Sequence, residues 1–251
     1  MDALTLGPLR AHKIVKTSGT TSKSDAASAK DPLTVVLMHG YGAPGDDLVG
    51  LAGAIDVPAG TTFLFPEAPS MLGDPALVSL MGDARAWWAI DINRFQRAVM
   101  QGTPAALAQL MKDVPEGMKA ARESVVAMLD AIEHDLKTKS DRIVLGGFSQ
   151  GSMLALDVAL HDARPLAGLV VLSGTLLAAD AWLPRMAARK ELRVFQSHGT
   201  EDPILPYPVA EHLHQVLDEA GLRVSFTSFE GGHGIPPNVM RDLGTWLRAL
   251  A

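Results

Sequence analysis

Residues 142–151 read Arg142-Ile143-Val144-Leu145-Gly146-Gly147-Phe148-Ser149-Gln150-Gly151, an apolar run followed by the pattern G-x-S-x-G. This order predicts a buried strand, a sharp turn and then a helix. Such a turn would lift the Ser149 hydroxyl out of the fold, and glycine on both sides keeps Cβ atoms out of a crowded backbone. Small residues also surround serine in ordinary turns, so the function depends on what else the chain contains.

The other apolar runs of the chain are mostly continuous and do not alternate with polar residues. Runs of this kind indicate strands that are covered on both faces, and hence a mainly parallel sheet. Helical patterns lie between them, which predicts a doubly wound α/β domain with helices on both faces of the sheet. The expected strands are 33–38, 61–65, 142–145, 167–172, 192–196 and 223–229, and the expected helices are 116–137, 150–161, 206–220 and 236–250.

Length and composition favour a single domain over residues 1–251, since a chain with 47% hydrophobic residues can bury a large core and no internal repeat is visible. We expect residues 1–30 to form an N-terminal extension, with an edge strand at 9–16 and a mobile loop rich in Ser, Ala, Lys and Gly at 17–30. Residues 70–115 have no steady period, and we expect them to form a cap over the site.

Charge and residue usage exclude several classes of function. The net charge of −6 and the pI near 5.7 argue against a nucleic-acid partner, which would need a basic stripe. The apolar stretches fall short of the roughly 20 residues of a membrane span, and residues 1–10 lack the features of a secretory signal. The absence of cysteine excludes disulfides, zinc thiolate sites and a cysteine nucleophile. We expect a cytoplasmic enzyme with a small-molecule substrate; the sequence does not indicate an oligomeric state.

Two loops follow Ser149 in the chain, each where a strand should end: residues 198–203 (HGTEDP) and 231–234 (GGHG). A serine hydroxyl is a poor nucleophile at neutral pH and needs a base, and the base needs an acid that fixes its tautomer. The order Ser, Asp, His is the one that the α/β-hydrolase architecture uses. We therefore predict Ser149 as nucleophile, Asp202 as orienting acid and His233 as general base.

The alternatives for these residues are structural. Asp202 could open an Asp-Pro turn, and His233 could be a turn histidine among glycines. Asp180 is a competing acid, but it precedes a helical pattern and is more typical of an N-cap. His198 is a competing base, but it lies on the wrong side of the proposed acid in chain order.

Residues 36–42 (VLMHGYG) run from the end of the first predicted parallel strand, 33–38, into a glycine-rich loop. Backbone N–H donors must point at the oxyanion of a tetrahedral intermediate. The predicted pair is the N–H of Tyr41 in this loop and the N–H of Gln150, directly after the nucleophile. His39 is interpreted as part of the loop's scaffold.

Residues 40–45 (GYGAPG) also fit G-x-G-x-x-G, and Glu67 follows the next strand, as in a nicotinamide dinucleotide site. Asp46 and Asp47 would put negative charge where pyrophosphate should bind, and Pro44 removes an N–H that could hold it. The sequence also lacks a phosphate-binding G-x-x-x-x-G-K-[ST] loop and the zinc motif H-E-x-x-H. We therefore expect no cofactor and no metal.

The irregular region supplies the candidate substrate pocket. Met81, Trp87 and Trp88 belong to an apolar set there that we expect to line the mouth of the site. The alternative is that these side chains complete the core.

Six blocks together resemble the phospholipase/carboxylesterase family, which includes the acyl-protein thioesterases. The resemblance implies an α/β-hydrolase fold, no cofactor, and hydrolysis of carboxylic esters or thioesters through an acyl-serine. It assigns Ser149, Asp202 and His233 to a catalytic triad, and the amides of Tyr41 and Gln150 to an oxyanion hole. The blocks are residues 38–42 (MHGYG), 65–69 (FPEAP), 85–90 (RAWWAI), 147–151 (GFSQG), 198–206 (HGTEDPILP) and 231–236 (GGHGIP).

The chain departs from the family at several points. Relatives commonly carry Leu at the position of Tyr41 and His at the position of Glu67, and the stretch from 90 to 116 is longer than usual. The Tyr41 change leaves the backbone donor in place, whereas the longer stretch bears on the size of the substrate. Two other functions stay open: a catalytically silent binding protein of the same fold, and a nicotinamide-dependent reductase.

Overall fold

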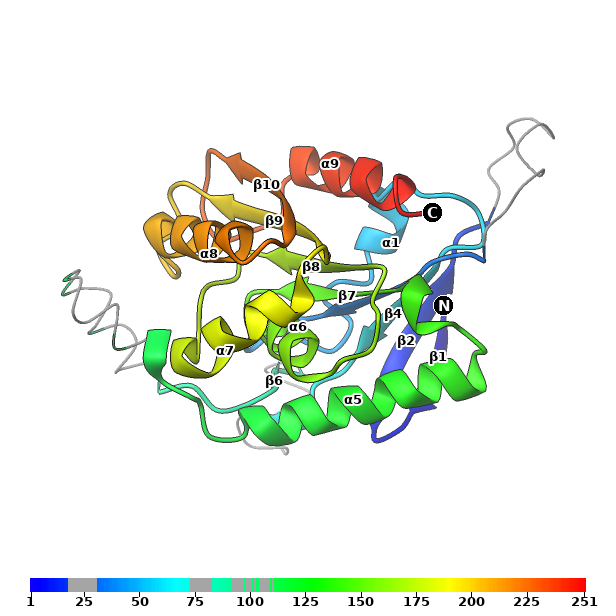
Figure 1. The fold of residues 1–251 in the computed structure, drawn as a ribbon. Coiled ribbons are helices and arrows are strands. Elements are labelled where there is room, and N and C mark those ends of the chain that lie inside the picture. Colours follow the sequence, from blue (N-terminus) through cyan, green and yellow to red (C-terminus); the bar gives the residue numbers. More distant parts are fainter. Residues whose placement is uncertain are drawn as a thin grey trace.

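Eight strands form one sheet, in the order β1-β2-β4-β3-β7-β8-β9-β10 (Figure 1). The computed structural model describes residues 1–17, 31–72, 83–91 and 111–251, with the single positions 97, 101, 103 and 109. The sheet is parallel from β4 to β10, and β1 and β2 join it antiparallel. The strands are β1 (Asp2–Leu6), β2 (Leu9–Val15), β3 (Thr34–Met38), β4 (Thr62–Pro66), β7 (Ile143–Phe148), β8 (Gly168–Leu172), β9 (Arg193–Gly199) and β10 (Arg223–Phe229). β5 (Ser70–Met71) and β6 (Arg85–Ala86) form a separate antiparallel pair.

Helices cover both faces of the sheet, as Figure 1 shows. On one face lie α1 (Leu51–Ala54) and α9 (Pro237–Arg248), whose buried side chains share one apolar cluster. The other face is covered by α5 (Met118–Asp135), α6 (Gln150–His161), α7 (Ala179–Met186) and α8 (Tyr207–Glu219). Short 3-10 turns are η2 (Ser140–Arg142) and η3 (Ala187–Arg189).

Side-chain alternation along the strands divides the core between the two faces. In β3, Val36 and Met38 pack toward α5 and α6, whereas Val35 and Leu37 pack toward α1 and α9. Each Val or Leu that is fully buried in this way stabilises the fold by roughly 1.5–3 kcal/mol. Burial on both sides explains why the central strands β3, β7 and β8 are continuous apolar runs. The parallel pairing from β4 to β10 confirms the predicted mainly parallel α/β fold.

The expectation of an edge strand at 9–16 is wrong. β2 pairs with β1 on one side and with β4 on the other, so β1 is the edge strand. Gly7 closes the β1–β2 hairpin at φ 55°, a conformation that glycine adopts without strain. Residues 18–30 of the expected loop, and most of the region 70–115, lie outside the described residues.

Candidate active site

Ser149 lies in the turn between β7 and α6, with φ 52° and ψ −119°. A non-glycine residue in this region carries strain of roughly 1–3 kcal/mol, and such strain gathers at functional sites. The neighbouring positions 147 and 151 have no room for a side chain. A Cβ on Gly147 would lie 2.5 Å from the carbonyl oxygen of Met38, and one on Gly151 would collide with the same carbonyl. The Ser149 N–H donates to Leu172 O at 2.8 Å, which fixes the turn to the end of β8.

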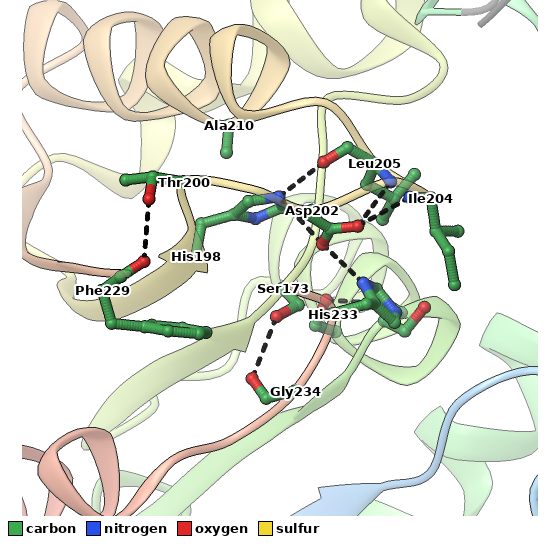
Figure 2. Close-up of polar contacts among 12 residues, drawn as sticks. Ser173, His198, Thr200, Asp202, Ile204, Leu205, Ala210, Phe229, His233 and Gly234 are labelled. Atoms are coloured by element: carbon green, nitrogen blue, oxygen red, sulfur yellow. Dashed lines mark hydrogen bonds and ion pairs between the residues drawn. The ribbon is translucent and has the colours of Figure 1, made fainter. Parts of the chain in front are cut away.

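Asp202 lies in the loop after β9, and both of its carboxylate oxygens accept hydrogen bonds (Figure 2). Oδ1 accepts from the backbone N–H groups of Ile204 and Leu205 at 2.8 and 2.9 Å. Oδ2 lies 2.6 Å from Nδ1 of His233. Burial alone would raise the pKa of Asp202, but hydrogen bonds from His198, His233 and Leu205 together lower it well below its usual range. The carboxylate is therefore ionised at neutral pH.

His233 lies in the loop after β10, and its side chain is 12% exposed. Backbone hydrogen bonds join this loop to the Asp202 loop: Thr200 N–H donates to Phe229 O at 2.8 Å, and Glu201 N–H donates to Gly231 O at 2.9 Å. The ring of Phe148, the residue before Ser149, has its centroid 4.8 Å from that of His233. The structure thus brings the segments of all three sequence-predicted residues together at the carboxyl ends of β7, β9 and β10.

His198, the competing base, contacts the same carboxylate from another direction (Figure 2). Its Nε2 lies 2.8 Å from Leu205 O and 3.3 Å from Asp202 Oδ2, so a proton on Nε2 has two acceptors. The side chain is fully buried, with 0% exposure, and its Nδ1 has no hydrogen-bond partner among the described residues. A substrate has no route to this ring along the surface.

Asp180, the competing acid, lies in the first turn of α7, whereas the N-cap position is occupied by Ala178. The interpretation of Asp180 as the cap is therefore wrong. An acidic residue in the first turn still interacts favourably with the helix dipole, which accounts for the sequence signal.

The loop that carries Tyr41 is held on both sides. Gly42 N–H donates to Arg85 O at 2.8 Å, and Arg85 N–H donates to Ala43 O at 3.0 Å. His39 Nδ1 lies 2.8 Å from Gly40 O, and its Nε2 accepts from Ala68 N–H at 3.1 Å. Burial lowers the pKa of His39, in spite of the Gly40 carbonyl, so this ring is neutral and acts as the scaffold that the sequence indicated.

Gln150 is the first residue of α6, so its backbone N–H has no acceptor within the helix. Its fully buried side chain joins the helix to the segment that follows β6. Oε1 accepts from Trp87 N–H at 3.0 Å, and Nε2 donates to Trp88 O at 2.9 Å. The indole N–H of Trp87 in turn donates to His39 O at 3.0 Å. The Gln150 and Tyr41 segments are thereby connected through one rigid set of contacts.

Sequence reasoning missed Arg85 as part of this arrangement. Its Nη1 donates to Ala68 O at 3.0 Å, and its Nη2 lies 3.4 Å from Glu67 Oε2. Glu67, the acidic residue of the alternative dinucleotide-site interpretation, is 8% exposed and also faces His12 Nε2 at 3.3 Å. Its side chain packs against Gly45. The Glu67 carboxylate therefore interacts with the residues that support the Tyr41 loop.

Two hollows flank the site. The first, which we call the Trp88 pocket, has a volume of about 400 Å³. It includes Trp88, whereas Trp87 is buried against His39 with ring centroids 5.5 Å apart. Met81 lies outside the described residues. The apolar side chains that line the Trp88 pocket include Ile90, Met111, Val114, Met153, Leu176, Leu177, Leu205 and Val209.

The second hollow, the Phe148 groove, has a volume of about 350 Å³. It is lined by Asp47, Leu48, Gly50, Leu51, Ala54, Phe148, His233, Gly234, Ile235 and Met240. In the described ranges, no group of His, Cys, Asp or Glu side chains converges in a way that could hold a metal ion. Across the same part of the chain, no helix has the length and apolar character needed to cross a membrane.

Comparison with known proteins relates the chain to one family of hydrolases. Residues 21–251 match the sequence model of the phospholipase/carboxylesterase family. Acyl-protein thioesterase 1 of Emericella nidulans is 29% identical over 233 residues, covering 88% of this chain and 91% of the relative. Its namesake from Schizosaccharomyces pombe is 32% identical over 176 residues, covering 69% and 70%.

Solved structures resemble the fold. Esterase PE8 superposes with a TM-score of 0.74 at 24% identity, covering 97% of this chain and 99% of that one. A carboxylesterase from Bacillus cereus superposes with a TM-score of 0.67 at 18% identity, covering 97% and 95%. Both likenesses extend over the whole arrangement of sheet and helices.

Proposed function

The chain belongs to the phospholipase/carboxylesterase family, and on that basis we propose that it is a serine hydrolase that cleaves carboxylic esters or thioesters through an acyl-serine intermediate. The observation that carries the proposal is the 2.6 Å contact between His233 Nδ1 and Asp202 Oδ2, directly beside the strained turn that bears Ser149. The names of the relatives, acyl-protein thioesterase, favour acyl substrates.

In the proposed first step, Ser149 Oγ forms a bond to the carbonyl carbon of the substrate while His233 Nε2 takes its proton. The carbonyl oxygen becomes an oxyanion, which accepts hydrogen bonds from the Tyr41 and Gln150 N–H groups. The bond from carbon to the leaving oxygen or sulfur then breaks. His233 gives its proton to that atom, so an alcohol or thiol departs and Ser149 carries the acyl group.

The second step reverses these roles. Water gives a proton to His233 as its oxygen bonds to the acyl carbon, and the bond to Ser149 Oγ breaks as the proton returns to it. A carboxylic acid leaves and the enzyme is restored. Asp202 stays ionised throughout and accepts a hydrogen bond from the Nδ1–H of His233, which keeps Nε2 free to act on Ser149.

His233 fits the base better than His198 does, because its side chain is partly exposed while His198 is fully buried. The Trp88 pocket is the proposed acyl site, since its apolar walls adjoin Met153 of α6, the helix that Ser149 precedes. Burying an acyl methylene there would contribute roughly 0.8 kcal/mol.

Labelling with a fluorophosphonate probe tests the proposal, together with turnover of a short nitrophenyl ester. We expect wild-type protein to be labelled and active, and Ser149→Ala to be neither. Ser124→Ala is a matched control, because that residue lies partly exposed on α5 and its hydroxyl donates to Ala120 O of its own helix. A wild-type chain that is folded, unlabelled and inactive would instead support a silent binding protein.

A further inference from the structure

The Phe148 groove and the Trp88 pocket draw on helices that cover opposite faces of the sheet. In the part of the chain that the structure describes, the two hollows have no lining residue in common. The Trp88 pocket draws on the α5–α8 face of the sheet, through Met153 and Val209, whereas the groove draws on α1 and α9, through Leu51 and Met240. A substrate centred on Ser149 therefore has two separate surfaces on which its two halves can rest.

The position of His233 indicates which half of the substrate lies in the Phe148 groove. It lines the Phe148 groove and does not line the Trp88 pocket. In the proposed reaction, the atom that must receive the proton of His233 is the leaving oxygen or sulfur. The rest of the leaving group is bonded to that atom, so it starts beside His233 and extends along the surface that His233 helps to form.

The groove has the chemistry of a binding surface for an apolar group. Leu51, Phe148, Ile235 and Met240 line it, and each is only partly buried in the protein itself. Partly exposed apolar side chains of this kind become more buried when a ligand covers them, which favours binding. The Phe148 ring lies 4.8 Å from the His233 ring, so the apolar surface is continuous with the proposed base.

The charge at the rim of the groove indicates which leaving groups it can accept. Asp47 is exposed, and it is the one acidic residue among the described residues that line the groove. A carboxylate at the rim repels an anionic leaving group and tolerates a neutral or cationic one.

We propose that the Phe148 groove is the leaving-group subsite, and that it takes the apolar portion of a neutral or cationic alcohol or thiol. The inference rests on the proposed hydrolase function and adds to it the chemistry of the group that departs. A lysophospholipid whose leaving group is a net anion, such as glycerol phosphate, is on this view a poorer substrate than a neutral ester of equal size.

Two series of esters test the assignment on the full chain. The leaving-group series holds the acyl part as acetate and lengthens the alcohol from ethanol to hexanol. The acyl series holds nitrophenol and lengthens the acid from acetate to octanoate. For the wild type we expect kcat/KM to rise about two- to fourfold per methylene in the leaving-group series, until the groove is filled.

Variants should separate the two surfaces. Met240→Ala should flatten the leaving-group series and leave the slope of the acyl series intact, whereas Val209→Ala in the Trp88 pocket should do the reverse. Leu51→Ala repeats the groove test from another element, and melting temperatures verify that each variant is folded. Thr245→Ala, exposed on α9 away from the groove, should change neither slope.

Charge gives an independent measurement. Asp47→Asn should raise turnover of a carboxyphenyl acetate about two- to fivefold relative to nitrophenyl acetate, and 0.5 M salt should remove the difference. The proposal is overturned if folded Met240→Ala and Leu51→Ala leave the leaving-group slope unchanged, or if they lower both slopes equally. Failure of the hydrolase function itself looks different, because then the wild type turns over neither series.

Discussion

His198 Nε2 lies 3.3 Å from Asp202 Oδ2, the same oxygen that is 2.6 Å from His233 Nδ1 (Figure 2). The carboxylate that orients the proposed base is therefore itself oriented by a second, fully buried histidine. Since His198 Nε2 also contacts Leu205 O at 2.8 Å, one ring holds both the carboxylate and the turn that follows it.

Removing members of the proposed triad should have graded effects. Ser149→Ala should lower kcat on the order of 10⁵- to 10⁶-fold, because the nucleophile is lost. His233→Ala should be about as severe, and Asp202→Asn less so, because it disturbs the tautomer without deleting the base. Nitrophenyl ester turnover checks this, with circular dichroism to verify folding. Activity of Ser149→Ala within tenfold of the wild type would contradict the assignment.

His198 should act as a positioning residue. His198→Leu leaves Asp202 Oδ2 without one of its donors, and we expect kcat to fall about tenfold, in line with the 1.5–3 kcal/mol of a hydrogen bond to a charged group. KM should change little, because the ring does not line either hollow. His198→Gln offers a side-chain N–H in its place and should recover part of kcat. A purely structural role would lower the melting temperature of both variants with kcat of the folded protein unchanged.

Local rules made the turn around Ser149 predictable, because its backbone leaves room only for glycine at 147 and 151. The parallel strands were predictable for a similar reason, since burial on both faces requires continuous apolar runs. The shared contact of His198 and His233 on Asp202 was not, because it depends on how two loops from different strands close on each other. The contact between Arg85 and Glu67 was not predictable for the same reason: the two residues are 18 apart in the chain and meet only after the loop has folded.

Acid should weaken the fold through Asp202. Its pKa is lowered in the folded state, so its contribution to stability is complete above the unfolded value of about 3.9 and is lost as pH falls below it. We expect the gap between the urea midpoints of the wild type and Asp202→Asn to begin to narrow near pH 4 and to narrow further as pH falls. Asp218→Asn, an exposed change on α8, should follow the wild type at each pH. If the difference in urea midpoint between the wild type and Asp202→Asn stays constant with pH, the Asp202 carboxylate is not the source of the loss of stability in acid.

His39 should make stability depend on pH over a higher range. Burial lowers the pKa of this ring in the folded state, so the unfolded chain takes up its proton at a higher pH than the folded protein does, beginning near pH 6.5. The wild type should therefore lose stability between pH 7 and 5, by up to about 1.4 kcal/mol per pH unit from this group. His39→Gln removes the titrating group, so its urea midpoint should fall less over the same range. Parallel curves for the two proteins would refute the prediction.

The acyl series also tests the Trp88 pocket through a substitution that enlarges a lining side chain and so makes the pocket smaller. Val209 is partly buried on α8 and lines this pocket together with Leu177 and Met111. Each buried methylene contributes roughly 0.8 kcal/mol, so wild-type kcat/KM should rise three- to fourfold per added methylene until the pocket is full. Val209→Phe fills part of the pocket, and the rise should stop at shorter chains while acetate turnover persists. Trp88→Ala is less suited to this test, because Trp88 is 3% exposed and truncating a buried tryptophan costs about 3–5 kcal/mol of stability. If Val209→Phe lowers turnover of every chain length by one common factor, the acyl chain does not occupy the Trp88 pocket.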